Sequence, residues 1–215
     1  MEIGRRSFIK GLALGAGVVL AKGYAFGAEP IAAAGPASLL LANFPLHKQE
    51  TPYTCGPASL RMVLEYLGHP LAEPEISQRM GTSPKLGTSF LQMHSCYNQY
   101  LKDFKIALAA HDKIGKAANN DLIFNSLGKD RPVIFTWLVE NYFKPKTLVG
   151  HYSVLIGFDR NRSEFTIANP FGSIHPIAFD RFWRLASYSP KPDDIPNVSS
   201  KSSLLRMPPD LVVLE

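Results

Sequence analysis

Three strand-like runs in the second half of the chain constrain the fold most strongly. They cover 131–139 (RPVIFTWLV), 151–159 (HYSVLIGFD) and 164–169 (EFTIAN), and each is rich in β-branched and aromatic residues. Only the polar turn 160–163 separates the second run from the third, so these two are expected to pair as an antiparallel hairpin centred near residue 160. The second half of the chain therefore predicts an antiparallel sheet.

Helical patterns precede those strands. Apolar residues recur with helical spacing up to Leu67, and Gly68 is expected to end that helix. A second amphipathic helix is expected over 90–104, with Thr88 as its cap. Shorter helices are expected over 74–80, 120–127 and 179–187, the last capped by Asp180, and further strands over 44–49, 105–110 and 211–215. Because the helices come first and neighbouring strands follow, the sequence predicts an α+β domain.

The first 28 residues have the features of an export signal rather than of a folded domain. The segment 1–28 starts with charged residues, continues with a short apolar run over 11–21 and ends in small residues, as secretory signals do. Its RRSFIKG motif at 5–11 resembles the twin-arginine export signal. An ordinary secretory signal that happens to carry two arginines is the alternative.

This interpretation sets the expected domain division and location. We predict a signal peptide over 1–28, a linker or short helix over 29–42 and one domain over 43–215, exported to the periplasm or secreted, with the twin-arginine translocase as partner during export and no stable membrane anchor. The signal segment contributes +3 of the formal net charge of +5, which leaves +2 for the rest. So small a charge gives no reason to expect nucleic-acid binding.

Only two cysteines occur in the chain, Cys55 and Cys96. Cys55 has three possible roles: a buried apolar residue, half of a disulfide with Cys96 in an oxidising compartment, or a nucleophile. It stands just before a helix that has Pro57 in its first turn, and the free N–H groups and dipole of such a helix favour a thiolate. We therefore expect a lowered thiol pKa at Cys55, whereas Cys96 is expected to be structural.

A thiolate nucleophile needs an acid–base partner, and His151 at the start of a strand is the candidate. In a hairpin centred near residue 160, His151 and Asn169 stand nine residues to either side and are expected to face each other or nearly so. Asn169 would then fix the tautomer of the imidazole. Asp159 is the rival orienting residue, although it is better explained as the end of its strand.

Gln49, six residues before Cys55, is the candidate for stabilising an oxyanion. Acyl transfer develops negative charge on the carbonyl oxygen, and a side-chain amide together with a backbone N–H can hold it. The Gln49 side chain and the Cys55 N–H are the natural pair for this role.

The order Gln49, Cys55, His151, Asn169 and the six-residue step between the first two resemble the papain-like cysteine peptidases. A closer resemblance is to the bacterial double-glycine leader peptidases and their stand-alone relatives. It covers roughly 44–172 and is carried by QETPYTCGPASLRMVLEYLG, followed in order by GTSPKLGTS, RPVIFTW and HYSVLIGFD-to-ANP. It implies a papain-like α+β fold, Cys55 as nucleophile, His151 as general base and acid, and Gln49 in the oxyanion hole. Where that family usually has Asp-Pro, this chain has Asn-Pro.

These expectations describe an exported cysteine peptidase that acts on a peptide or protein substrate. Two other functions stay open: a papain-like acyltransferase or amidase with the same triad, and a non-catalytic binding module with the same fold. No cofactor and no metal are expected, because the remaining histidines and acidic residues show no ligand spacing and no nucleotide-binding glycine pattern occurs.

Overall fold

The computed structural model describes residues 35–100, 106–109, 116–140, 147–187 and 211–214. The predicted signal peptide lies outside the described residues. None of the helices in the described ranges is long and apolar enough to cross a membrane.

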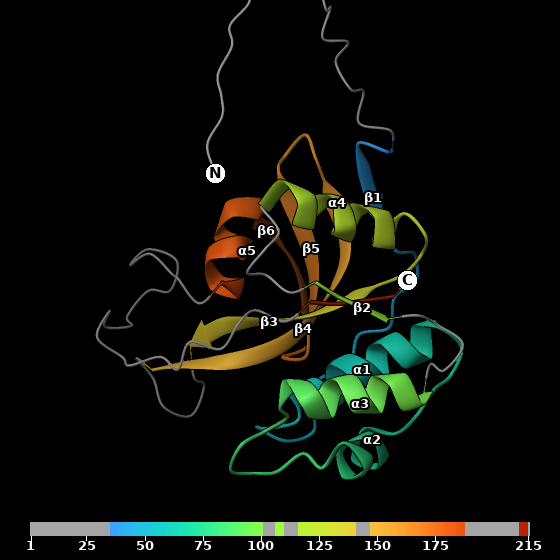
Figure 1. Ribbon diagram of the computed structural model, residues 1–215, viewed down its shortest axis with the longest axis vertical. Coiled ribbons are helices and arrows are strands. Elements are labelled where there is room, and N and C mark those ends of the chain that lie inside the picture. The colour runs from blue at the N-terminus through green and yellow to red at the C-terminus, as the bar shows by residue number, and fades with distance from the viewer. Residues whose placement is uncertain (1–34, 101–105, 110–115, 141–146, 188–210, 215) are drawn as a thin grey trace, which may run out of the picture. The chain divides into compact units, whose positions relative to one another are not determined.

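Three successive helices follow the first strand, and most of the strands come later in the chain (Figure 1). The helices are α1 (Cys55–Tyr66), α2 (Glu73–Met80), α3 (Phe90–Tyr100), α4 (Lys116–Leu127) and α5 (Phe179–Ala186). The strands are β1 (Ser38–Leu40), β2 (Ile106–Ala109), β3 (Val133–Glu140), β4 (Leu148–Asp159), β5 (Glu164–Asn169), β6 (Ser173–Ala178) and β7 (Leu211–Leu214). The prediction of an α+β fold with an antiparallel sheet is therefore confirmed.

All pairings in the sheet are antiparallel, in the order β2-β7-β3-β4-β5-β6, and β1 pairs with the last residues of β4. Where β1 meets β4, a Cβ on Gly157 would come within 2.6 Å of the Leu39 carbonyl oxygen. Only glycine allows the two strands to approach this closely. The outer edge strand β6 carries Pro176, which has no N–H to offer to another strand.

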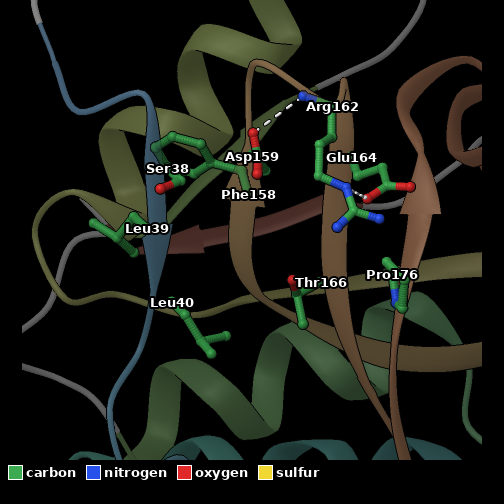
Figure 2. A pocket seen from close by; sticks show the side chains of 9 residues that line it. All are labelled: Ser38, Leu39, Leu40, Phe158, Asp159, Arg162, Glu164, Thr166 and Pro176. Atoms are coloured by element: carbon green, nitrogen blue, oxygen red, sulfur yellow. Dashed lines mark hydrogen bonds and ion pairs between the residues drawn. The ribbon is translucent and has the colours of Figure 1, made fainter.

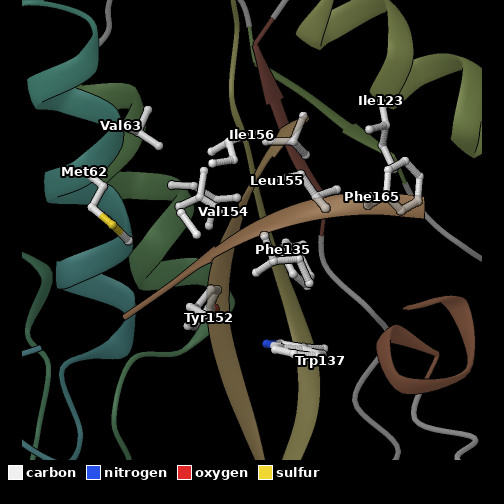
Figure 3. Packing of buried hydrophobic residues seen from close by; sticks show 14 of the residues in the cluster. Met62, Val63, Ile123, Phe135, Trp137, Tyr152, Val154, Leu155, Ile156 and Phe165 are labelled. Carbon is white, nitrogen blue, oxygen red and sulfur yellow. The ribbon is translucent and has the colours of Figure 1, made fainter. Parts of the chain in front are cut away.

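Strand β4 lies at the centre of the core and is buried on both faces. Its residues from His151 to Phe158 are all buried, a continuous pattern rather than an alternating one. Val154 faces Val63 of α1, whereas Leu155 points to the other side, where Ile123 of α4 lies (Figure 3). Burying each such aliphatic side chain contributes about 1.5–3 kcal/mol. The packing of α1 on β4 therefore fixes the start of α1 relative to the start of β4.

Several details differ from the sequence-based expectations. No strand forms over 44–49, where one was expected. The first strand, β1, lies earlier, inside the segment 29–42 that was expected to be a linker or short helix. Helix α3 is capped by Ser89 instead of Thr88, because Ser89 and Gln92 exchange backbone-to-side-chain hydrogen bonds of 2.7 and 3.3 Å.

Helix α5 also begins differently from the expectation. Asp180 is not its cap: Ala178 holds that position, and Asp180 in the first turn pairs with Arg184 at 2.9 Å instead. That carboxylate still lies at the positive end of the helix, where it is favourable.

Candidate active site

Cys55 is the first residue of α1, whereas the sequence analysis placed it just before the helix. The turn before it is held by Thr54, whose hydroxyl accepts a hydrogen bond from the Thr51 N–H at 3.1 Å and lies 2.9 Å from the Thr51 hydroxyl. The next residue, Gly56, packs so tightly on Thr88 that an added Cβ would lie 2.9 Å from the Thr88 hydroxyl oxygen. This close contact holds the loop before α3 against the N-terminal end of α1.

A cleft of about 350 Å³ opens at this end of α1, and both Cys55 and His151 line it. One wall is the hairpin Ser83–Gly87, which is closed by two backbone hydrogen bonds of 3.0 and 2.8 Å between its end residues. Leu86 near the tip of that hairpin is 83% exposed. The full set of lining residues is Pro52, Tyr53, Cys55, Pro84, Lys85, Leu86, Gly87, Thr88, Val149, Gly150, His151, Tyr152 and Phe171.

His151 and Asn169 are both buried and are joined by a hydrogen bond of 3.0 Å between His151 Nε2 and Asn169 Oδ1. The same Oδ1 accepts the Phe171 backbone N–H at 2.9 Å, which identifies that atom as the amide oxygen. Because an amide oxygen can only accept, His151 Nε2 must carry a proton. The neutral imidazole therefore keeps a free electron pair on Nδ1, the atom able to act as a base.

The predicted contact between these two side chains is present, but the predicted register is wrong. The turn is centred later than predicted, because Asp159 pairs with Glu164, and a bulge between Leu155 and Gly157 then moves the register one residue back toward the prediction, so that Val154 lies opposite Ala168. If that register continues, Ser153 lies opposite Asn169, and His151 is two residues away from Ser153 on the same strand. Diagonal neighbours at this separation are still within reach of long side chains.

Phe171 covers the His151–Asn169 pair. Its ring stacks on the imidazole with centroids 4.3 Å apart and planes inclined by 22°, although the side chain itself is 43% exposed. Burial lowers the pKa of His151 to about 4, against the smaller raising effect of the Asn169 hydrogen bond. His151 is therefore neutral at physiological pH. Sequence reasoning missed Phe171, because an aromatic residue two positions after an asparagine has no distinctive pattern.

The thiol of Cys55 behaves differently from the expectation. Burial raises the pKa of Cys55, and hydrogen bonds from the backbone N–H groups of Tyr152 and Gly56 oppose this only in part. The predicted stabilisation by the start of α1 is thus present, but it is smaller than the cost of burying a thiolate. The raised pKa of Cys55 and the lowered pKa of His151 both favour the neutral forms, a thiol and an imidazole.

Gln49 is held close to this site but does not line the cleft. Its Nε2 donates to the Thr51 carbonyl at 2.6 Å, and its Oε1 is buried without a hydrogen-bond partner. The Gln49 backbone N–H donates to the Pro170 carbonyl at 2.8 Å, which ties this segment to the loop after Asn169. One of the two Nε2 hydrogens remains after the bond to Thr51.

A second cavity of about 350 Å³ lies on the open face of β1, β4, β5 and β6 (Figure 2). Leu40, Thr166 and Pro176 line it, and the ion pair between Arg162 and Glu164 (2.9 Å) lies at one end. No cysteine or histidine lines this cavity, so it has no nucleophile–base pair. In the described part of the chain, no group of three or more His, Cys, Asp or Glu side chains could hold a metal ion.

Cys96 and the rival residue Asp159 lie outside the cleft. Both cysteines are free thiols, and Cys96 is buried in α3, where burial raises its pKa to about 11. Asp159 Oδ1 accepts the Arg162 N–H at 3.1 Å and so shapes the turn after β4. Both residues therefore have the structural roles that the sequence favoured.

Comparison with known proteins gives a match to the sequence profile of the Peptidase_C39 like family over residues 41–189. Two solved structures share the fold. Interpain A, a cysteine protease of Prevotella intermedia, aligns with a TM-score of 0.54 at 12% identity, over 83% of this chain and 95% of that one. The peptidase domain of Streptococcus ComA, a bi-functional ABC transporter involved in quorum sensing, aligns with a TM-score of 0.50 at 19% identity, over 66% and 91%. No curated protein sequence matches.

Proposed function

Since the chain belongs to the Peptidase_C39 like family and is a cysteine peptidase with a papain-like fold, we propose that it cleaves peptide bonds through a triad of Cys55, His151 and Asn169. The observation that carries this proposal is the 3.0 Å hydrogen bond from His151 Nε2 to Asn169 Oδ1, which leaves Nδ1 free to act as the base. Cys55 and His151 line the same cleft.

The chemistry follows from the neutral resting pair. As Cys55 Sγ attacks the scissile carbonyl carbon, its proton passes to His151 Nδ1, and the Cys55 N–H holds the charge on the carbonyl oxygen. The Nε2 hydrogen of Gln49 that the bond to Thr51 leaves free is the second donor, and because Gln49 lies outside the cleft lining, this role requires the carbonyl oxygen to lie at the edge of the cleft beside Gln49. Nδ1 then returns the proton to the leaving amine, which gives an acyl-enzyme. A water molecule, deprotonated by Nδ1, hydrolyses the thioester and restores the thiol.

Asn169 contributes by accepting the hydrogen bond from His151 Nε2–H in every step of the reaction. It keeps the ring in the tautomer that the reaction needs and stabilises the imidazolium that forms transiently. Phe171 keeps water away from that hydrogen bond, so the orientation of the ring is fixed before substrate arrives. The thiolate thus forms only during attack, because burial disfavours it in the resting enzyme.

We further propose that the twin-arginine-like segment over 1–28 directs the chain out of the cytoplasm, so that its substrate is a peptide or protein in the periplasm or outside the cell. The test is a fusion of residues 1–42 to a reporter that is active only after export. Export that survives Arg5→Lys/Arg6→Lys replacement would contradict the twin-arginine route.

The peptidase proposal is tested by incubating the full chain, under reducing conditions, with a proteome-derived peptide library and identifying new termini by mass spectrometry. Cleavage that is lost in Cys55→Ala supports it. The same digest with a free amine added distinguishes hydrolysis from acyl transfer, because transfer would join that amine to the new carboxyl ends. Cleavage that survives Cys55→Ala would overturn the assignment of the nucleophile.

A further inference from the structure

Glu73, the first residue of α2, is an almost fully buried carboxylate beside the site. Only 1% of the residue is exposed. Its Oε1 accepts the Glu50 backbone N–H at 2.9 Å, whereas its Oε2 is buried with no hydrogen-bond partner. Neither the family match nor the proposed triad gives this residue a role.

The burial of this carboxylate is unfavourable for stability. A buried charge needs several hydrogen bonds to balance its lost hydration, and only one oxygen of Glu73, Oε1, accepts a backbone hydrogen bond while Oε2 has no partner. Burial accordingly raises the pKa of Glu73, although the Thr54 hydroxyl and the Glu50 N–H lower it in part, and the Glu50 carboxylate and the Arg61 guanidinium add smaller opposing effects. An apolar side chain would avoid the cost but would leave the Glu50 N–H unpaired.

The role of Glu73 follows from the position of the Glu50 N–H, whose hydrogen bond it accepts. Glu50 directly follows Gln49, and the neighbouring N–H of Gln49 donates to the Pro170 carbonyl at 2.8 Å. Two consecutive amides are thus held from two elements, one by α2 and one by the loop that follows Asn169. The backbone from which the Gln49 side chain projects is fixed between them.

We infer that Glu73 is a positioning residue for the oxyanion hole: its carboxylate oxygen fixes the Glu50 amide and thereby holds Gln49 and the turn leading to Cys55 in the conformation that the transition state requires. This inference rests on the proposed function, because it assigns Glu73 a role in that reaction. A displacement of about 1 Å at such a group costs up to about a hundredfold in rate.

The charge of Glu73 does not activate the nucleophile. Its negative charge raises the pKa of Cys55 and so disfavours the thiolate. The useful property is the acceptor oxygen, which a neutral amide also supplies. This separates two substitutions of similar size: Glu73→Gln keeps an acceptor oxygen, and Glu73→Met does not.

The experiment compares these two variants in the full chain with an N-acetylated dipeptide p-nitrophenyl ester as the probe. Glu73→Met is expected to lower kcat by about tenfold to a hundredfold with KM changed by less than about threefold, and Glu73→Gln to restore kcat to within about threefold of the wild type. Glu75→Gln is the control and leaves kcat unchanged, because Glu75 is a partly exposed residue on the same helix whose side chain pairs with Arg79.

Amide hydrogen exchange supplies a readout that does not need turnover. Glu73→Met is expected to accelerate exchange at the Glu50 N–H by about tenfold or more relative to Glu73→Gln, with the amides of β4 unchanged. If Glu73→Met does not fold, Glu73→Asp, which withdraws the acceptor by one methylene, takes its place in both measurements.

The outcomes separate this inference from the proposed function. Wild-type kcat in Glu73→Met, an equal loss in Glu73→Gln, or unchanged exchange at Glu50 would each overturn the role of Glu73. A wild-type chain that shows no Cys55-dependent release of p-nitrophenol would overturn the proposed function instead, and the exchange measurement would still decide whether Glu73 holds the segment.

Discussion

Replacing Phe171 by alanine should raise the pKa of His151. The Phe171 ring covers one face of the imidazole at 4.3 Å, and burial is the main reason why the pKa of His151 is lowered to about 4. Without the ring, water reaches the imidazole and hydrates its charged form, so the penalty for protonation falls. The hydrogen bond to Asn169 favours the protonated ring and remains in place.

The expected size of the His151 pKa shift depends on how much of the imidazole the Phe171 ring covers. Full return to the ordinary value of 6.5 would be worth about 3 kcal/mol, at about 1.4 kcal/mol for each pKa unit. Phe171 shields one face, while the rest of His151 stays packed and only 3% of the residue is exposed. We therefore expect the pKa to rise by about one unit, which corresponds to about 1.4 kcal/mol.

The assay is an NMR titration of the His151 ring proton, identified by its absence in His151→Gln. The acid limb of kcat/KM should move to higher pH by the same amount, because a protonated ring cannot accept the Cys55 proton. Ile174→Ala is the control, since Ile174 is 48% exposed against 43% for Phe171 and lies nearby on β6. A His151 pKa in Phe171→Ala that equals the wild-type value, or falls below it, would refute this reasoning.

Three further predictions concern the hydrogen-bond partners, the acid stability and the sheet. Asn169→Ala removes the oxygen that accepts hydrogen bonds from the His151 ring and the Phe171 backbone N–H, and it should lower kcat by about a hundredfold or more with little change in KM. Steady-state kinetics test this, and a loss of kcat under about threefold would contradict it. Because the pKa of His151 in the folded state lies below its unfolded value, the contribution of His151 to stability should be full above about pH 6.5 and decline by up to about 3 kcal/mol as the pH falls toward about 4. Urea unfolding of the wild type and of His151→Gln across this range tests this. An equal dependence of the unfolding free energy on pH in the two proteins would contradict it. Gly157→Ala brings a Cβ to 2.6 Å from the Leu39 carbonyl oxygen and should cost about 2 kcal/mol or more of stability; an unchanged melting temperature would show that β1 is free to move away.

Patterns local in sequence were sufficient to predict most of the elements. The presence of α1 directly at Cys55 follows to within two residues from the apolar spacing and Pro57, and the β4–β5 hairpin follows from two strand-like runs around a short polar turn. Strand β1 could not be predicted in the same way. Three residues carry too little pattern, and this strand exists because its backbone pairs with the end of β4 beside Gly157.

The site was predictable in its residue types but not in its electrostatics. The contact between His151 and Asn169 was expected from the hairpin, although the turn is centred later than predicted and the bulge between Leu155 and Gly157 corrects the register by only one residue. The raised pKa of Cys55 could not be predicted, because it depends on how much protein surrounds the thiol. The stacking of Phe171 on His151 and the burial of Glu73 could not be predicted either, because residues far apart in the sequence create them.

The measurement that tests the central proposal most directly is detection of the acyl-enzyme. The full chain, under reducing conditions, is mixed with an N-acetylated dipeptide p-nitrophenyl ester, quenched in acid within milliseconds, and examined by intact mass and peptide mapping. The proposed mechanism predicts one acyl group per chain on Cys55, formed far more slowly in His151→Ala and absent from Cys55→Ala. An acyl group on Cys96 or another residue, or a rate at Cys55 that does not depend on His151, would contradict it.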